Sequence, residues 1–250
     1  MITELLADLR AESQVLDDLV APLDDWSVPT PAEGWTIANQ ISHLRWTDRV
    51  AALAARDPDA FAEALRRAGL DALEEGAREP ITLAEWRASR VEVAEALAAL
   101  PPGVKMPWFG PSMSATSMAT ARLMETWAHG QDVADALGVT REPTDRLKHV
   151  AHIAVRTFGW SFVVHGQAAP QVPVRVELVA PDGGAWTWGP EDAENRITGP
   201  ALDFCLLATQ RRHRDDLAVT AVGEAAAAWL SVAQAFAGPA GPGRGRQERP

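Results

Sequence analysis

Helical spacing of apolar residues runs through the first 165 residues of the chain, and no segment there alternates with a period of two. This spacing predicts helices that each bury one face, most simply in an up-and-down bundle. Thr36 has the character of an N-cap, and Thr82 with Glu85 three residues later forms a capping box. The expected helices cover residues 2–21, 36–56, 59–76, 82–100, 114–137 and 144–165.

The pattern changes after Pro170. VPVRVELVA (172–180) alternates apolar and polar residues, which predicts a strand, and the turn signal Asp182-Gly183-Gly184 predicts a hairpin to a second strand. Further strands are expected at 195–199 and 217–223, with helices at 200–213 and 224–236. The fold class is therefore α+β. We expect a helical bundle over 1–168, a small α+β domain over 169–237 and a disordered tail over 238–250.

Composition excludes several classes of protein. A net charge of −11 disfavours a nucleic-acid partner, and the chain has no apolar run of the length, roughly 18 residues, that a membrane helix needs. The N-terminus does not read as a signal peptide, and the single cysteine, Cys205, rules out an internal disulfide. We expect a cytoplasmic protein, a monomer or a homodimer, that does not bind membranes.

An acid, a histidine and a second acid share one helix face in METWAHGQDV (124–133). Glu125 and His129 are four residues apart and Asp132 follows three later, so all three side chains lie on one strip. Small and apolar residues flank the strip, which indicates that it faces the bundle interior. Unpaired charges are costly there, so the strip needs partners or a metal.

A third candidate ligand, His43, lies on the helix that follows Thr36, between apolar neighbours. His43 with Glu125 and His129 makes a set of two histidines and one carboxylate, which suits catalytic zinc or ferrous iron. Asp132 would then orient a ligand or bind substrate. The alternative is a surface ion pair on one helix and a satisfied core histidine on the other.

Two other features carry less chemistry. His149 and His152 form a competing pair, but no carboxylate accompanies them and Arg156 would repel a cation, so they are predicted to be surface or interface residues. Cys205 lies among Phe204, Leu206 and Leu207 and is predicted to be a buried structural thiol.

Three stretches carry a resemblance to a known family. PWFGPSMSATSMATARLMETWAHGQDVADALG (107–138) resembles actinobacterial metal-binding proteins related to the mycothiol-dependent maleylpyruvate isomerases, within the DinB-like bundle superfamily. EGWTIANQISHLRWTD (33–48) is similar to that superfamily's element in which a tryptophan and a Ser or Thr precede His-Leu. ITGPALDFCLLATQRRHRDDLAVTAVG (197–223) is similar to the isomerases' small C-terminal domain, itself similar to sterol-carrier modules.

The resemblance implies a DinB-like four-helix bundle that binds a divalent metal, usually zinc, with Fe²⁺ or Ni²⁺ as alternatives. Its ligands map onto His43, Glu125 and His129, and its aspartate onto Asp132. The isomerases place an arginine, in a Gly-Arg context, near the metal. Here that stretch reads Gln210-Arg211-Arg212 without the glycine, so Arg211 is the match and Arg212 an alternative.

We expect a metal-dependent enzyme that uses a low-molecular-weight thiol such as mycothiol, for transfer to or isomerisation of a small electrophilic substrate. Arg211 or Arg122 would hold a carboxylate of either partner, and Trp46, Trp108, Phe109 and Trp127 would wall the cleft. One alternative is a thiol-independent Lewis-acid enzyme, such as a hydrolase, lyase or cyclase. Another is a non-catalytic, metal-stabilised protein that binds an apolar ligand.

Overall fold

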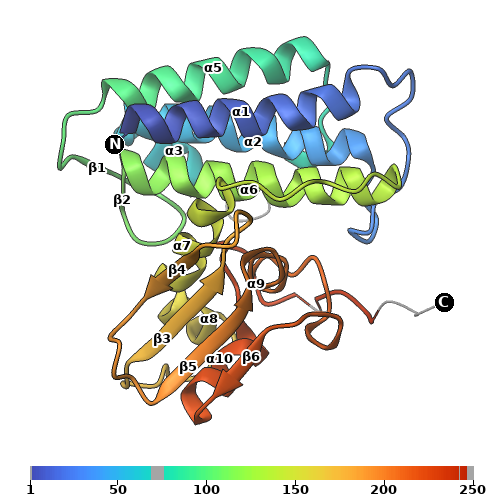
Figure 1. Cartoon of the computed structure of the whole chain (residues 1–250). Coiled ribbons are helices and arrows are strands. Elements are labelled where there is room, and N and C mark those ends of the chain that lie inside the picture. Colours follow the sequence, from blue (N-terminus) through green and yellow to red (C-terminus); the bar gives the residue numbers. More distant parts are fainter. Residues whose placement is uncertain (1, 69–75, 242, 247–250) are drawn as a thin grey trace. The chain divides into compact units, whose positions relative to one another are not determined.

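The computed structural model describes residues 2–68, 76–241 and 243–246. Its contacts divide the chain into two compact units, Met1–Arg141 and Glu142–Pro250, and each is described by itself (Figure 1). Among the described residues, no helix combines the length and the apolar character needed to cross a membrane.

Four long helices of the first unit pack side by side (Figure 1). Helix α1 packs mainly on α6, and α2 packs on both α5 and α6, which confirms the predicted four-helix bundle. A short helix, α3, contacts α2, and two short antiparallel strands pair within the loop that precedes α6. The elements are α1 (Ile2–Val20), α2 (Ile37–Arg56), α3 (Pro58–Ala68), α5 (Leu83–Ala99), β1 (Lys105–Met106), β2 (Met113–Ser114) and α6 (Ala115–Ala136).

Side-chain caps fix where the bundle helices begin. The Thr36 hydroxyl accepts a hydrogen bond from the backbone N–H of Asn39, and the Asn39 side chain accepts one from the Thr36 N–H. Thr82 and Glu85 form the same reciprocal box at α5. These bonds satisfy backbone donors that no helical carbonyl reaches, so both predicted N-caps are confirmed.

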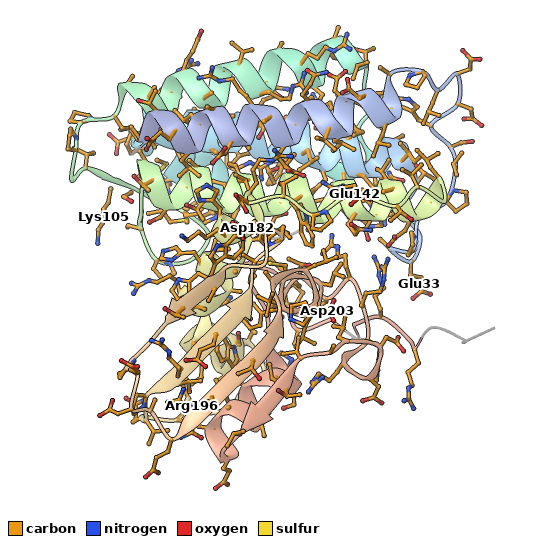
Figure 2. The ribbon with its side chains drawn as sticks, viewed as in Figure 1. Glu33, Lys105, Glu142, Asp182, Arg196 and Asp203 are labelled. Atoms are coloured by element: carbon orange, nitrogen blue, oxygen red, sulfur yellow. The ribbon has the colours of Figure 1, made fainter. Side chains whose placement is uncertain are left out.

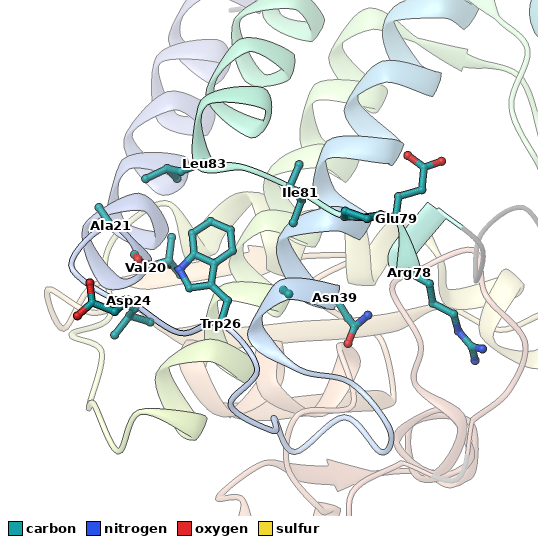
Figure 3. Close-up of a pocket in the computed structure, with 12 residues that line it drawn as sticks. Val20, Ala21, Asp24, Trp26, Asn39, Arg78, Glu79, Ile81 and Leu83 are labelled. Atoms are coloured by element: carbon teal, nitrogen blue, oxygen red, sulfur yellow. Dashed lines mark hydrogen bonds between the residues drawn. The ribbon is translucent and has the colours of Figure 1, made fainter.

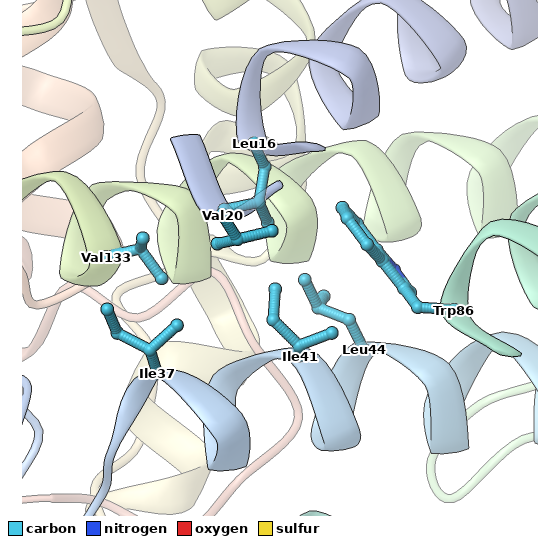
Figure 4. Close-up of a cluster of buried hydrophobic side chains, with 7 residues drawn as sticks. All are labelled: Leu16, Val20, Ile37, Ile41, Leu44, Trp86 and Val133. Atoms are coloured by element: carbon cyan, nitrogen blue, oxygen red, sulfur yellow. The ribbon is translucent and has the colours of Figure 1, made fainter. Parts of the chain in front are cut away.

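An apolar core joins all four long helices (Figure 4). Ile37, Ile41 and Leu44 form the buried stripe of α2. At about 100° per residue, Gln40 and His43 fall together on one flank of that stripe. Burial of each aliphatic side chain stabilises the bundle by about 1.5–3 kcal/mol, so the core also fixes the rotation of α2 that positions His43. The cluster consists of Leu16, Val20, Ile37, Ile41, Leu44, Trp86 and Val133.

The second unit combines a four-stranded sheet of order β4-β3-β5-β6 with helices (Figure 1). β3 pairs with β4 as the predicted antiparallel hairpin, and it pairs with β5 in parallel. Helices α9 and α10 contact the strands, α7 contacts α9, and α8 contacts α10. The elements are α7 (Leu147–Arg156), α8 (Phe158–Val164), β3 (Val174–Val179), β4 (Ala185–Trp188), β5 (Asn195–Pro200), α9 (Ala201–Ala208), η1 (Arg214–Asp216), β6 (Thr220–Val222) and α10 (Glu224–Val232).

Three expectations differ from the structure. The helix expected over 144–165 is two helices, α7 and α8, which meet at Thr157, and both belong to the second unit. The boundary between units therefore falls after Arg141 rather than after residue 168, because the buried face of α7 packs on α9. The loop at 101–113 contains β1 and the start of β2, which the sequence did not predict.

The ends of two expected segments lie partly outside the described residues. The helix expected over 59–76 was predicted to end near Gly69 or Gly76. The structure describes α3 as far as Ala68, and residues 69–75 lie outside the described residues. In the expected tail, the described residues 238–241 and 243–246 contain no helix or strand.

Candidate metal centre

Two helices of the first unit bring His43, Glu125 and His129 together. One potential ligand atom from each lies within 4.8 Å of the other two, the only such group of three among the residues that the structure describes. Glu125 Oε2 lies 3.2 Å from His129 Nε2 and 3.6 Å from His43 Nε2. The side chains are 21%, 11% and 13% exposed, in the order Glu125, His129, His43.

The spacing on each helix explains this convergence. Glu125 and His129 are one turn apart on α6, so their side chains share a face. His43 reaches the same point from the flank of α2, which packs against α6. The two imidazole rings lie 4.7 Å apart between centroids. Two imidazole nitrogens and one carboxylate oxygen are ligands that zinc and ferrous iron accept.

Electrostatics inside the cluster favour an ionised carboxylate. Burial alone would raise the pKa of Glu125, but hydrogen bonds to His129 and His43, together with the charge of these rings when they are protonated, outweigh it and hold that pKa well below its usual range. A carboxylate that stays ionised beside two imidazoles supplies the negative charge that a divalent cation needs. The donor set therefore fits a divalent metal.

Two further residues contact His129, and neither role was predicted from the sequence. Gln40 Oε1 contacts Nδ1 of His129, the ring nitrogen that faces away from Glu125. The indole of Trp35 stacks on the His129 ring at 5.9 Å and 14°, and it lies 5.5 Å from the His43 ring. A signal was present, because Gln40 shares the flank of His43 and Trp35 directly precedes the N-cap.

The loop before α2 holds Trp35 in place. Thr30 N–H donates to the Trp35 carbonyl at 2.8 Å, and Pro29 forms an isolated bridge with Thr36. Gly34 closes this turn with a φ of +73°, a conformation that favours glycine. Figure 2 labels Glu33 in this loop and Lys105 in β1, and the two lie at opposite ends of the first unit.

Arg122 and Asp132, two predicted site residues on α6, are both buried. Arg122 Nε donates to Asp48 Oδ1 at 2.9 Å and its Nη2 to the Leu44 carbonyl at 3.3 Å, so its described contacts are inside the bundle. This geometry does not support the expected role of Arg122 in holding a cosubstrate carboxylate. Asp132 is fully buried, and its part as an orienting or substrate-binding group stays a proposal.

The tryptophans expected to wall the cleft have other ring partners. Trp46 stacks with Phe109 at 6.1 Å, and Trp108 stacks with Phe61 at 6.0 Å, in one aromatic cluster of the first unit. Trp127 is buried beneath the guanidinium of Arg141, 5.8 Å from its ring centroid. The aromatic ring that the structure places against the two histidines is that of Trp35.

A separate hollow of about 550 Å³ opens elsewhere on the first unit (Figure 3). It lies where the end of α1, the start of α2 and the segment before α5 meet, and Trp26, Asn39 and Arg78 are among its lining residues. None of the three candidate ligands is among the described residues that line it. Its position therefore gives it no part in the metal centre.

The remaining candidates belong to the second unit. Arg211 Nη1 donates to the Thr209 carbonyl at 2.6 Å, and Arg212 Nη1 donates to the Arg211 carbonyl at 2.7 Å, just after α9.

His152 is exposed, and its Nδ1 accepts a hydrogen bond from the Trp188 indole at 3.2 Å. Partial burial lowers the pKa of His152, and the charges of Arg156 and His149 lower it further. Cys205 is fully buried, and burial raises the pKa of its thiol, so the structural assignment is confirmed.

Comparison with known proteins identifies the group to which this architecture belongs. Residues 9–134 match the family model described as the mycothiol maleylpyruvate isomerase N-terminal domain, which covers half of the chain and contains all three candidate ligands. The chain belongs to this family. Residues 170–222, in the second unit, match a model described as wyosine base formation.

Some known proteins resemble this chain in sequence, and others resemble it in fold. Two uncharacterized proteins of Mycobacterium tuberculosis, Rv0036c of strain H37Rv and MT0041 of strain CDC 1551, are each 56% identical over 252 positions, covering 96% of this chain and 97% of theirs. The mycothiol-dependent maleylpyruvate isomerase has the same fold, with a TM-score of 0.54 at 16% identity, and a histidine-to-alanine mutant of it gives 0.55 at 15%. Each match covers 88% of this chain and 92% of the isomerase.

Proposed function

We propose that the chain is a metal-dependent enzyme that uses a low-molecular-weight thiol such as mycothiol. The enzyme would either transfer the thiol to a small electrophilic substrate or isomerise that substrate. The observation that carries the proposal is the convergence of His43, Glu125 and His129 in a chain of the mycothiol maleylpyruvate isomerase family. Zinc is the metal we propose, with Fe²⁺ and Ni²⁺ as alternatives, and the site of action is the cytoplasm.

The residues of the cluster have distinct parts in this proposal. His43 Nε2, His129 Nε2 and a Glu125 oxygen would hold the metal, and a set of three protein ligands would leave room for a ligand from solution. When bound, zinc supplies the Lewis acidity that favours the thiolate form of a thiol. Trp35 covers one side of the two imidazoles and limits access of water to them. Asp132 and Arg211 remain the proposed groups for substrate contact and for a carboxylate.

Metal analysis of the purified protein tests the ligands. The His43→Ala, His129→Ala double variant should lose bound zinc. A matched control is the His149→Ala, His152→Ala double variant, which also removes two histidines but from α7 in the second unit. The control should keep the zinc content of the wild type. Full zinc occupancy in the first variant would refute the proposed site.

Thermal shift then tests the thiol. Zinc-loaded protein should gain thermal stability with mycothiol but not with S-methylated mycothiol, because a thioether cannot form the thiolate. Zinc-depleted protein should show no gain with either compound. If zinc-loaded protein does not respond to mycothiol, the thiol is not its cosubstrate, and a thiol-independent Lewis-acid reaction replaces the first proposal.

A further inference from the structure

A chain of hydrogen bonds runs from the loop before α2 to the outer nitrogen of His129. The Thr30 hydroxyl contacts the Trp35 carbonyl at 2.9 Å, and the Gln40 amide nitrogen contacts the Thr30 hydroxyl oxygen at 2.9 Å. Gln40 Oε1 then contacts Nδ1 of His129. Gln40 is fully buried, so the protein rather than solvent determines which atoms it faces.

Elementary donor and acceptor counting gives this chain a direction. The Trp35 carbonyl can only accept a hydrogen bond, so the Thr30 hydroxyl donates its one proton to that carbonyl. Its oxygen then accepts from the Gln40 NH₂ group, which fixes the orientation of the amide. The Gln40 carbonyl oxygen that remains can only accept, so the nitrogen that it meets must carry a proton.

We infer that Gln40 is a positioning residue that keeps a proton on Nδ1 of His129, so that Nε2 is the nitrogen presented to a metal. The inference rests on the proposed metal site, and it adds a residue outside the ligand set. Metal-bound histidines usually donate their second N–H to a carboxylate, a backbone carbonyl or water. Here a neutral side-chain amide has that part, and α2 supplies both this amide and the ligand His43.

The second histidine provides an internal comparison. His43 Nδ1 is buried and has no hydrogen-bond partner among the residues that the structure describes. Both imidazoles face Glu125 through Nε2, yet only His129 has a described acceptor on its other side. The proton on Nδ1 of His129 should therefore exchange with water more slowly than any ring proton of His43.

Long-range ¹H–¹⁵N correlation spectra of the histidine rings test this inference on the full chain. The spectra are recorded on ¹⁵N-labelled protein, first metal-free and then zinc-loaded. The His129 ring is assigned by the signals that disappear in His129→Ala. We expect a protonated, slowly exchanging Nδ1 in both forms and coordination through Nε2 in the zinc form. An unprotonated Nδ1 in the wild type overturns the inference.

Substitutions separate positioning from a general contribution to folding. Gln40→Leu removes the acceptor and should weaken zinc binding by about 10- to 100-fold and speed exchange of the Nδ1 proton. Gln40→Glu keeps an acceptor and should retain both. Ser42→Ala is the matched control, because it also removes a buried hydrogen-bonding group of α2, one that contacts the carbonyls of Gly76 and Glu79. It should change neither readout.

The outcomes distinguish this inference from the proposed function. If zinc binds the wild type and Gln40→Leu equally well, with Nδ1 exchange unchanged, Gln40 has no positioning role although the metal site stands. If the wild type binds no zinc, the proposed function fails, and the metal-free spectrum still decides whether Gln40 holds the proton. If Gln40→Leu does not fold, Gln40→Glu and the wild-type spectra give the same decision.

Discussion

Charged residues inside the bundle have two different roles. Arg122 and Asp48 form a buried pair, and Ser89 adds a hydrogen bond to the Asp48 carboxylate at 3.3 Å. Glu125, only one turn from Arg122 on α6, instead faces two imidazoles. Burial raises the pKa of Asp48, and the neighbouring guanidinium opposes that effect. The same helix thus carries one charge that is neutralised within the fold and one that is available to a cation.

Replacing Arg122 should therefore damage stability. Arg122→Met leaves the Asp48 carboxylate buried without its partner, and we expect a loss of about 3–5 kcal/mol in the free energy of unfolding, measured with urea. Adding Asp48→Leu removes the orphaned charge and should restore much of that loss. A variant of wild-type stability that lost only its response to mycothiol would instead support a role in holding a cosubstrate.

Asp17 makes stability depend on pH. Its carboxylate accepts from Arg87 at 2.6 and 2.8 Å and from Arg90 at 2.8 Å, and these contacts lower its pKa against the opposing effect of burial. The pKa of Asp17 in the folded protein is below the unfolded value of 3.8. Its contribution to the free energy of unfolding is therefore complete above pH 3.8 and is lost as pH falls through the folded pKa.

Asp17→Asn removes this charge and should cost about 1.5–3 kcal/mol near pH 7. The difference in free energy of unfolding between wild type and variant should decrease as pH falls below the normal pKa range of a carboxyl group. Urea unfolding of both proteins from pH 7 to pH 3 measures the gap. Asp25→Asn is the comparison variant, because the pKa of the exposed Asp25 is lowered by local bonds to Ser27, so its effect on the free energy of unfolding should be smaller and should fall with pH in the same direction. A gap that stays constant with pH would contradict the role of Asp17.

At the scale of elements, local signals predicted the bundle well and the junction between units poorly. The caps at Thr36 and Thr82 act within one helical turn, so sequence alone places those starts. The break at Thr157 has no proline or glycine before it in α7, and the Thr157 hydroxyl bonds back to the carbonyls of Ile153 and Ala154. Apolar periodicity is continuous across that break, which is why one helix was expected where two form.

In the candidate site too, local spacing predicted some residues, while contacts between distant parts of the chain were not predicted. Glu125 and His129 follow from one helical turn, and His43 follows from its buried position on a second helix. The contact between Gln40 and His129 joins residues 89 positions apart. The flank that Gln40 shares with His43 indicates that Gln40 lies near the site, but it does not indicate which atom of which residue Gln40 contacts. Arg122 was expected to hold a carboxylate of a ligand, but it instead bonds the carboxylate of Asp48 across the bundle. The face of a helix on which a side chain lies predicts which side chains are close to one another. It does not predict which of them form hydrogen bonds or ion pairs.

Packing between α2 and the segment before α5 gives a test at this scale. A Cβ added at Gly76 would lie 2.3 Å from Cγ of Trp46, so Gly76→Ala must displace the indole. We expect a loss of about 1–3 kcal/mol in the free energy of unfolding and a changed tryptophan fluorescence. Gly110→Ala is the control, since a Cβ there meets nothing within 4 Å. Equal stability of the two variants would show that Trp46 does not pack against Gly76.

For the whole molecule, the division into two units separates the proposed tasks. The first unit contains the three candidate ligands together with Gln40 and Trp35. The second contains Arg211, the proposed anchor for a carboxylate. Metal binding and thiol-dependent chemistry should therefore be separable. Arg211→Ala in the full chain should keep its zinc content and lose turnover, and loss of zinc would contradict that separation.

A fragment of residues 1–141 gives the strongest test of this separation, because the bundle core and every proposed ligand lie within it. The fragment should fold as a helical protein and bind zinc with an affinity close to that of the full chain. Zinc at about 100 times its dissociation constant should add about 2.7 kcal/mol to the fragment's free energy of unfolding, since the unfolded fragment has no assembled site. The same fragment with His43→Ala should show no such gain. A fragment that folds but needs residues 142–250 to bind zinc would mean that the second unit takes part in holding the metal, and the ligand set proposed from the bundle would be incomplete.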